Sequence, residues 1–333
     1  MNKVFIMGPA NTGSGAIVEY LCSRSDGYDP LKGQEFRLIQ ERDGLSSLHR
    51  SLTTEFHFDD AMYALIAFEN LAKRLGKNSR KFRIPPRLGY GFSKRIPSYD
   101  KAISQFLKDI TLSTIGIFPL QDLLRLSTID WIRVKCGGFP RSANIIRQKP
   151  IPVPPDEFMK HAKKLISSLF FETHEGEKIK KDLMIFDQCG SFFSPISSTQ
   201  YFGESRKIIL VTRDPCDVFA SQRRKSNISG SAEDFARYQA GMAAHVVKSE
   251  WRDERVLRVA FEDFVLNHDQ GRKKICDYLE IDSTIASSYD PRDSIKSIGG
   301  YKELLSSDEI ATLRSTPQWP KNADRDITVA NKT

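Results

Sequence analysis

The sequence predicts an α/β protein built as a three-layer sandwich with a mostly parallel central sheet. Short apolar runs of the kind that form buried parallel strands recur along the chain, and helical spacing of apolar residues follows them. Strands alternating with helices in this way are typical of α/β folds. The 333 residues, 40% of them hydrophobic, suffice for one elaborated domain with a sizeable core.

The first strand is expected at 4–7, where Gly8 and Pro9 stop an apolar run, and a helix is expected at 16–22. A second strand is expected at 36–40, followed by a helix that begins near Asp43 as its N-cap. Three further strands, each leading into a helical segment, are expected at Asp182–Phe186, Lys207–Thr212 and Val256–Phe261.

Between about residues 54 and 181 the pattern changes to helical stretches, at 61–75 and 155–171, separated by basic or proline-rich loops. No strand crossover needs that length. We therefore interpret this part as a mainly helical insertion over the active face that binds the substrate. The whole chain, 1–333, is expected to form one domain, with a short flexible tail after about residue 320.

The composition narrows the ligand class. A net charge of +8 favours an anionic ligand, and a polyanionic small molecule or glycan fits this bias as well as nucleic acid does. Five cysteines lie far apart without a CxxC pair, which suits a reducing compartment. With no signal-like leader and no run long enough to span a bilayer, we expect a cytoplasmic protein with at most peripheral membrane contact.

The stretch GPANTGSG, residues 8–15, has the GxxxxG frame of a phosphate-binding loop between a strand and a helix. In such loops the backbone N–H groups and the helix N-terminus attract phosphate. A nucleoside triphosphatase would carry lysine at position 14 and serine or threonine at position 15, but Ser14 and Gly15 stand there. Triphosphate hydrolysis is therefore disfavoured. A tightly packed turn without a ligand stays an equal alternative.

A second motif lies in KIILVTRDPCDVFASQRR, residues 207–224. Arg213 is expected at the carboxyl end of a strand, where α/β proteins bind ligands. Asp214 and Pro215 are expected to start a helix as N-cap and first residue. Ser221 lies eight residues past Arg213 and can face back toward it. An arginine fork with a hydroxyl is a good phosphate receptor.

At this point the chain resembles a known family. RDPxDVxxS after a strand is similar to the 3′-phosphate motif of sulfotransferases that use 3′-phosphoadenosine-5′-phosphosulfate (PAPS). VLRVAFEDFVLNHDQGRKKICDYLEI, residues 256–281, resembles a further strand–helix motif of that family. SIKSIGGYKELLSSDEIATL, residues 294–313, resembles its carboxyl-terminal nucleotide-binding segment. With the loop at 8–15, four stretches match in order, whereas the insertion matches little.

The resemblance implies a P-loop-related fold, PAPS as co-substrate, the bisphosphate PAP as product, and no metal. PAPS has no γ-phosphate, which explains the missing loop lysine. The implied 5′-phosphosulfate site is Thr12, Gly13, Ser14 and Gly15, with Pro9, Ala10 and Asn11 beside it. Arg213 and Ser221 would hold the 3′-phosphate. In the carboxyl-terminal segment, the residues implied to close over the nucleotide are Gly299, Tyr301 and Lys302.

One position departs from the family pattern. Relatives commonly place lysine or arginine two residues before Gly13, where this chain has Asn11. An amide can donate a hydrogen bond but brings no positive charge, so either another basic residue substitutes or turnover is slow. Residues 73–95 hold nine lysines and arginines and no acid. They are expected to form either a solvated surface or, with Phe82, Tyr90 and Phe92, a cationic acceptor-binding loop.

Glu35 is the first candidate for a general base, because glycan-modifying members of the family carry a glutamate near this place. Glu41 is its reserve, and Arg37 is a candidate partner of substrate or sulfate. The catalytic candidates are thus Glu35, Asn11 and Arg37, while a surface pairing of Glu35 with Arg37 or Lys32 is an equal alternative.

Other polar residues fit catalysis less well. His49 and His57 are expected to be packing or surface residues. Asp187 and Gln188, after a predicted strand, would orient the acceptor or cap the next helix.

The sequence therefore predicts transfer of a sulfuryl group from PAPS to a hydroxyl of an anionic or glycan acceptor, most simply a carbohydrate, with no nucleic acid as partner. Two alternatives stay open. One is a non-catalytic PAP- or PAPS-binding protein, which Asn11 motivates. The other is a P-loop small-molecule kinase, which Ser14 at the lysine position disfavours.

Overall fold

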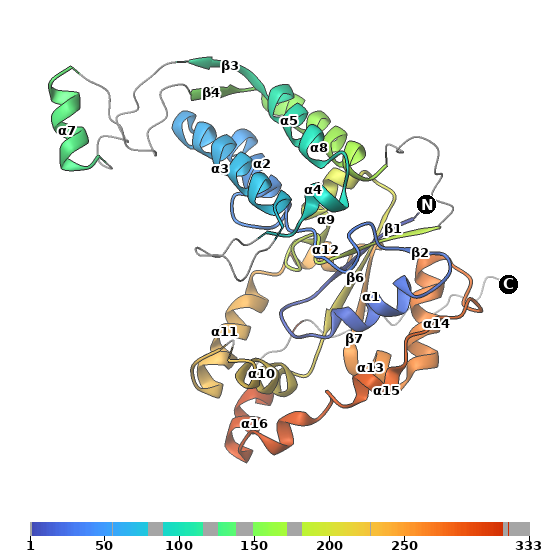
Figure 1. The fold of residues 1–333 in the computed structure, drawn as a ribbon. Coiled ribbons are helices and arrows are strands. Elements are labelled where there is room, and N and C mark those ends of the chain that lie inside the picture. The colour runs from blue at the N-terminus through green and yellow to red at the C-terminus, as the bar shows by residue number, and fades with distance from the viewer. Residues whose placement is uncertain are drawn as a thin grey trace. The chain divides into compact units, whose positions relative to one another are not determined.

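The computed structural model divides the chain into two compact units (Figure 1). The first unit comprises Met1–Phe36 and Gly176–Thr333, and the second comprises Arg37–Glu175. The structure describes residues 2–54, 56–78, 89–115, 126–137, 149–171, 182–226, 228–315 and 319.

The first unit is built on a five-stranded parallel sheet with the order β2-β5-β1-β6-β7. Its strands are β1 (Asn2–Met7), β2 (Gly27–Tyr28), β5 (Leu183–Asp187), β6 (Arg206–Thr212) and β7 (Val256–Ala260). The α/β class and the parallel sheet are therefore confirmed. Because all strands run the same way and β1 lies between β5 and β6, three neighbouring carboxyl ends meet at one edge of the sheet.

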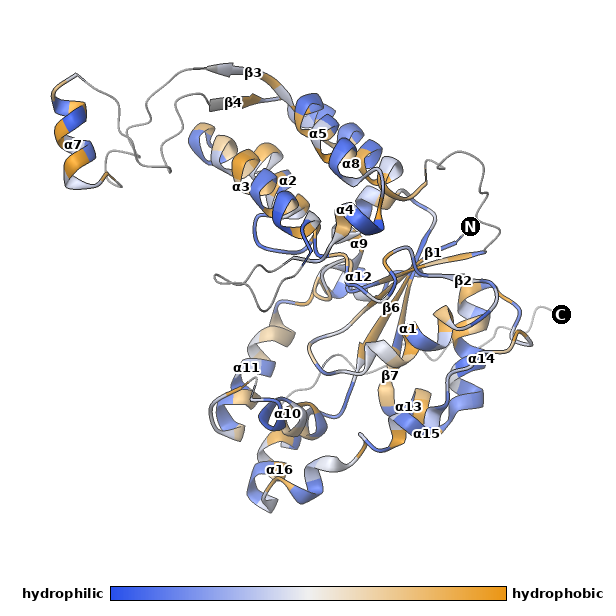
Figure 2. Ribbon diagram, in the orientation of Figure 1, coloured by the Kyte–Doolittle hydropathy of each residue, from blue (hydrophilic) through white to orange (hydrophobic). Residues whose placement is uncertain are grey.

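Both faces of the sheet are buried, which explains why its strands are almost continuously apolar (Figure 2). On one face, Val4 and Ile6 pack against helices α1 (Ser14–Cys22), α13 (Phe261–Leu266) and α14 (His268–Leu279). On the other face, Phe5 stacks on Phe186 with ring centroids 5.2 Å apart and meets the edge of Phe202 at 4.7 Å.

The expected strand at 36–40 is wrong. The Phe36 amide donates to the Asp187 carbonyl at 3.3 Å, but the chain then turns, with the Glu41 amide donating to the Arg37 carbonyl at 3.2 Å. The apolar residues of this run are buried in a turn, and burial alone produced the strand-like signal. The sheet edge is instead formed by β2, whose two residues pair with β5.

The helix expected from Asp43 begins slightly later. This helix, α2, spans Leu45–Thr53, and its N-cap is Gly44, which makes no side-chain cap hydrogen bond. Asp43 has a φ of 68° and so lies in the left-handed region, which does not suit an N-cap.

A second hydrophobic cluster of the first unit is formed by residues of α10 (Pro215–Arg224), α11 (Ala232–Ala244) and the segment 301–313. Phe219 and Phe235 form its centre, with ring centroids 5.0 Å apart. The other short elements are α9 (Pro195–Ser198), η1 (Gln200–Phe202), α12 (Lys248–Trp251), α15 (Pro291–Ile295), η2 (Gly300–Glu303) and α16 (Ser307–Ser315).

The second unit is mainly helical and adds a two-stranded antiparallel ribbon. The aromatic rings of Phe68, Phe106 and Phe158 pack in its core. Besides α2, its elements are α3 (Phe58–Gly76), α4 (Phe92–Arg95), α5 (Tyr99–Asp109), β3 (Thr111–Ile115), α7 (Thr128–Lys135), β4 (Lys149–Pro152) and α8 (Pro155–Phe170).

A buried ion pair fixes the segment after α1. The Arg24 side chain is fully buried and donates two hydrogen bonds to Asp26, from Nε to Oδ1 at 2.9 Å and from Nη2 to Oδ2 at 2.8 Å. Arg24 Nη2 also donates to the Asp282 carbonyl at 2.8 Å. Arg24 thereby joins the amino-terminal segment to the loop after α14.

We expect Arg24→Met to lower the free energy of unfolding by about 3–5 kcal/mol, because Asp26 would stay buried without its counter-charge. Urea denaturation followed by circular dichroism measures this loss. The double variant with Asp26→Leu should recover a large part of it, since no charge is then left buried. A loss below about 1 kcal/mol in the single variant would contradict this role.

Candidate functional site

The loop from Gly8 to Gly15 leaves the central strand β1 and ends in the first turn of α1. Asn11 and Gly13 have φ values of 64° and 84°, both in the left-handed region. Thr12 is buried between them and donates from its hydroxyl to the Pro9 carbonyl at 2.8 Å. Left-handed residues of this kind, next to a helix N-terminus, are typical of anion-binding loops.

Glycine is required at two positions of this loop for packing reasons. A Cβ atom at Gly13 would lie 2.3 Å from the Phe261 ring, and one at Gly8 would lie 2.3 Å from Thr12 Oγ1. A Cβ atom at Gly15 would meet nothing within 4 Å. Tight packing therefore accounts for Gly8 and Gly13 but not for Gly15, where the loop faces open space.

Gln188 holds the two ends of the loop together. Its Nε2 donates to Ser14 Oγ at 3.0 Å, and its Oε1 accepts from the Gly8 amide at 3.4 Å. Gln188 follows β5 directly and has a φ of 48°. The sequence suggested acceptor binding or helix capping for this residue, and the structure places it against the loop instead.

Arg213 joins the loop to the carboxyl-terminal segment. Its Nη1 donates to the Asn11 carbonyl at 2.9 Å, its Nη2 donates to the Ser297 carbonyl, and the guanidinium lies 5.0 Å from the centre of the Phe261 ring. Its Nε is buried without a hydrogen-bond partner among the described residues. Burial lowers the pKa of Arg213, yet a guanidinium stays charged in proteins.

The start of α10 is built as the sequence predicted. Asp214 is the N-cap and accepts from the Cys216 amide at 2.7 Å, with Pro215 at the first helical position. Glu262, at the start of α13, accepts from the Asp214 amide at 2.9 Å. The backbone next to Arg213 is therefore held from both sides, which orients its side chain.

Asp217 positions the carboxyl-terminal segment and was missed in the sequence. Its buried carboxylate accepts from the Gly299 amide at 2.8 Å and from the Tyr301 amide at 3.3 Å. Gly299 has a φ of 77°. In the sequence, an acidic residue in the first turn of α10 indicates only a favourable interaction with the helix dipole. The burial of Asp217 in the structure reveals that it also holds the carboxyl-terminal segment.

Of the other two residues implied in that segment, one is buried and one is exposed. Tyr301 lies with its ring in the hydrophobic cluster of α10, α11 and α16, and its hydroxyl accepts from Arg314 Nη2 at 2.6 Å. Lys302 is exposed at the surface. Tyr301 therefore has a structural role, and only the side chain of Lys302 is presented to solvent.

Lys225, the C-cap of α10, was also missed. Its Nζ donates to Asn11 Oδ1 at 2.8 Å. Its amide donates to the carbonyl of Ser221 at 3.2 Å, so Lys225 lies one turn beyond Ser221 on the same face. Gln222 Nε2 reaches the Ala10 carbonyl at 3.4 Å. The signal available in the sequence was the four-residue spacing between Ser221 and Lys225.

The catalytic candidates fall on different units. Glu35 is half-buried in the first unit, next to Phe36 and thus near the carboxyl end of β5. Arg37 belongs to the second unit and donates from Nη1 to Glu41 Oε1 at 3.0 Å. The reserve base Glu41 therefore pairs with Arg37.

The two histidines behave as the sequence indicated. His49 stacks on Phe158 with ring centroids 5.0 Å apart, and burial lowers its pKa. His57 is exposed, 3.8 Å from Asp60. Neither arrangement points to catalysis.

The basic stretch at 73–95 is described only in part, and residues 79–88, with Phe82, lie outside the described residues. Phe92 is fully buried and meets the Tyr99 ring edge-on, with centroids 5.6 Å apart, while Tyr90 packs on Phe92 at 5.8 Å. Phe92 is therefore a core residue, which contradicts its suggested role in an acceptor-binding loop.

A cavity of about 420 Å³ lies beside the loop in the first unit. Its lining is mostly apolar and aromatic, with hydrogen-bonding groups from α10 and α11, and includes neither lysine nor arginine among the described residues. The residues used below are Pro9, Gln222, Asp234, Tyr238 and Trp319.

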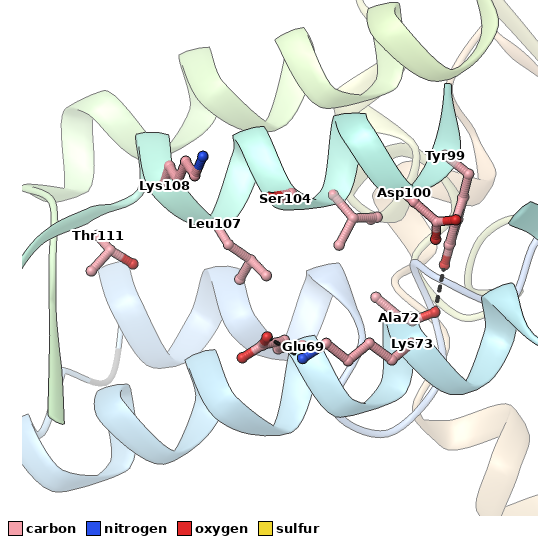
Figure 3. A pocket seen from close by; sticks show the side chains of 10 residues that line it. Glu69, Ala72, Lys73, Tyr99, Asp100, Ser104, Leu107, Lys108 and Thr111 are labelled. Carbon is pink, nitrogen blue, oxygen red and sulfur yellow. Dashed lines mark hydrogen bonds and ion pairs between the residues drawn. The ribbon is translucent and has the colours of Figure 1, made fainter. Parts of the chain in front are cut away.

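A second hollow, of about 650 Å³, lies between α3 and α5 in the second unit (Figure 3). Lys73 on its wall is paired with Glu69, and the Tyr99 hydroxyl donates to the Ala72 carbonyl at 3.0 Å. The ion pair lies within α3, and the Tyr99 hydrogen bond joins α5 to α3, so these polar groups already have partners.

The fold of the chain is similar to that of several proteins of known structure. No family model and no curated protein matches the chain. The sulfotransferase domain of the olefin synthase from Synechococcus PCC 7002 is 14% identical over 96% of both chains, with a TM-score of 0.44. A sulfotransferase from Alicyclobacillus acidocaldarius is 12% identical over 97% of this chain and 98% of its own, with a TM-score of 0.32.

A mouse sulfotransferase complexed with PAP is 19% identical over 46% of this chain and 50% of its own, with a TM-score of 0.24. With TM-scores below 0.5 and identities below 20%, these similarities decide neither the activity nor the substrate.

Within the described ranges, no group of three or more histidine, cysteine, aspartate or glutamate side chains is arranged to hold a metal ion. None of the helices described is long and apolar enough to cross a membrane.

We expect Gly13→Ala to lower the free energy of unfolding by about 2–4 kcal/mol, since alanine is strained at this φ and its methyl group would overlap the Phe261 ring. Gly15→Ala is the matched control and should change stability by less than about 1 kcal/mol. Urea denaturation of both variants checks this difference. Equal effects would mean that the loop does not pack on Phe261 as described.

The Glu262 carboxyl makes the stability of the folded chain depend on pH. Burial raises the pKa of the Glu262 carboxyl. The folded chain thus holds this proton more tightly than the unfolded chain does, in which glutamate titrates at about pH 4.3. The stability that the protonated Glu262 carboxyl contributes is therefore lost as pH rises from that value through the raised pKa. Glu262→Gln keeps an acceptor for the Asp214 amide without the charge. Its stability relative to wild type should therefore increase as pH rises from about 4 to about 8.

Denaturation curves at several pH values measure this trend. Glu254→Gln, which alters an exposed carboxyl, is the control and should show no comparable trend. A Glu262→Gln difference that falls with rising pH would contradict the sign.

Proposed function

We propose that this protein is a sulfotransferase that moves a sulfuryl group from PAPS to a hydroxyl of an acceptor and releases PAP. The observation that carries the proposal is Arg213, which links Asn11 of a phosphate loop without lysine to Ser297 of the carboxyl-terminal segment. The loop and the carboxyl-terminal segment thus meet at one guanidinium. A nucleotide with separate 5′ and 3′ phosphate groups matches this arrangement, and a triphosphate does not.

The proposed roles follow the geometry. The loop from Pro9 to Gly15, through its backbone amides and Ser14, would hold the 5′-phosphosulfate. Arg213 and Ser221 would hold the 3′-phosphate through the guanidinium and the hydroxyl. Lys302 would add positive charge near the nucleotide, while Gly299 and Tyr301 shape the segment through Asp217.

In the reaction the acceptor oxygen attacks the sulfur atom, and the bond from sulfur to the 5′-phosphate oxygen breaks. The electron pair of that bond stays on the bridging oxygen, so the 5′-phosphate of the departing PAP carries one more negative charge than it did in PAPS. The sulfuryl group keeps its own negative charge on the acceptor, and the acceptor proton passes to a base. We propose Glu35 as that base, supported by its half-buried position near the carboxyl end of β5. Positioning and charge stabilisation suffice for this chemistry, with no metal needed.

For the acceptor we propose a carbohydrate. The cavity beside the loop combines the rings of Tyr238 and Trp319 with the hydrogen-bonding groups of Gln222 and Asp234. Aromatic faces suit the apolar side of a sugar, and amides and carboxylates suit its hydroxyls. Because the described lining includes neither lysine nor arginine, it suits an uncharged sugar better than an anionic one.

The five free thiols fit a reducing, cytoplasmic location.

The non-catalytic alternative, a PAP- or PAPS-binding protein, rests on Asn11, which brings no charge to the loop. An assay with labelled PAPS and a broad panel of acceptors separates the two. Binding of PAP with no transfer to any acceptor would favour the alternative.

We expect Arg213→Ala to weaken binding of PAP by about 10- to 100-fold, the range for a hydrogen bond to a charged group, and to leave 5′-AMP affinity nearly unchanged. Titration calorimetry with both nucleotides measures this. Arg272→Ala, on the remote helix α14, is the control and should bind both as wild type does. Equal weakening of PAP and 5′-AMP by Arg213→Ala would refute the 3′-phosphate assignment.

A further inference from the structure

The phosphate loop contains no basic residue of its own, yet a lysine ammonium contacts it. Residues 8–15 read GPANTGSG, and Lys225 Nζ lies 2.8 Å from Asn11 Oδ1. Lys225 is separated from Asn11 by more than 200 residues of sequence and comes from the last turn of α10. The tertiary fold therefore brings a positive charge to a loop that lacks one.

The ammonium of Lys225 is not paired with an acidic side chain in the described part of the chain. Its neighbour Arg223 is bound to Glu309 at 2.9 Å, whereas Lys225 makes no ion pair with any described carboxylate. The Lys225 side chain is exposed, so its ammonium can meet an incoming anion. The carboxyl end of a helix favours a lysine in any case, but that preference does not require contact with the loop.

Asn11 connects this lysine to the rest of the site. Its carbonyl accepts from Arg213 and its side-chain oxygen accepts from Lys225, so two cations approach the same loop residue through its two oxygens. Asparagine tolerates the left-handed φ of 64° found here. A lysine at position 11 would instead bring a second positive charge against Lys225.

We infer that Lys225 is the cationic ligand of the group bound in the loop, the 5′-phosphosulfate of PAPS, and that Asn11 positions it. This inference rests on the proposed function. As the bond from sulfur to the 5′-phosphate oxygen breaks, negative charge grows on that phosphate. The ammonium of Lys225 stabilises this charge and transfers no proton. Arg213, which joins the Asn11 carbonyl to the Ser297 carbonyl, serves the 3′-phosphate instead.

Binding of three nucleotides to Lys225→Met tests the assignment by calorimetry. We expect PAP and 5′-AMP to bind about tenfold more weakly and 3′-AMP to bind as in wild type. Arg213→Ala should show the opposite pattern, losing 3′-AMP and keeping 5′-AMP. Lys273→Met, an exposed lysine on α14, is the matched control and should change none of the three affinities.

Exchanging the charge between the two positions tests the role of Asn11. Asn11→Lys alone should weaken binding of PAP, because its ammonium would repel that of Lys225. The double variant Asn11→Lys with Lys225→Met carries one cation at the loop again and should recover most of the affinity. Lys225→Arg should keep affinity within about threefold. In the transfer assay, Lys225→Met should lower kcat by a larger factor than it weakens PAP binding.

The outcomes separate this inference from the proposed function. If the wild-type protein binds no PAP, the proposed function fails. If wild type binds PAP and Lys225→Met binds all three nucleotides equally well, Lys225 is not a ligand and the inference is overturned. Selective loss of 3′-AMP in Lys225→Met would also overturn it, by moving the lysine to the 3′-phosphate.

Discussion

The guanidinium of Arg213 is the contact on which the candidate site depends. It lies against the Phe261 ring and donates to Asn11 on one side and Ser297 on the other, so segments about 200 and 80 residues away in the chain meet at one side chain. A partly buried guanidinium needs its hydrogen bonds met, because an unpaired charge away from water is costly. The two carbonyls meet that need only in part, because the Nε is buried without a partner among the described residues.

Phe261 gives this arrangement its rigidity. The Phe261 ring belongs to the hydrophobic core on one face of the sheet. It leaves no room for a side chain at Gly13, and the Arg213 guanidinium lies against it. Glu262 beside it fixes the Asp214 amide, and Asp217 fixes the amides of the carboxyl-terminal segment. Carboxylates thus accept hydrogen bonds from backbone amides around the candidate site.

Local sequence signals predicted much of this and missed what depends on distant contacts. The strands at 4–7, 182–186 and 207–212, and the Asp214 N-cap, were predictable because apolar runs and cap chemistry act over a few residues. The strand at 36–40 was wrong, since burial in a turn gives the same apolar pattern as a strand. Lys225 could not be found locally, because its partner Asn11 belongs to another motif.

The sequence by itself determined the α/β class, the order of the motifs and the loop without lysine, since each is written in contiguous residues. It also determined that Asn11 brings no charge. Where positive charge meets the loop depends on contacts between distant parts of the chain. Parallel strands bring their carboxyl ends to one edge, and α10 then reaches Asn11 with Lys225 at 2.8 Å. The spatial order of β1 and β6 sets that contact, and it is fixed by packing rather than by neighbouring residues.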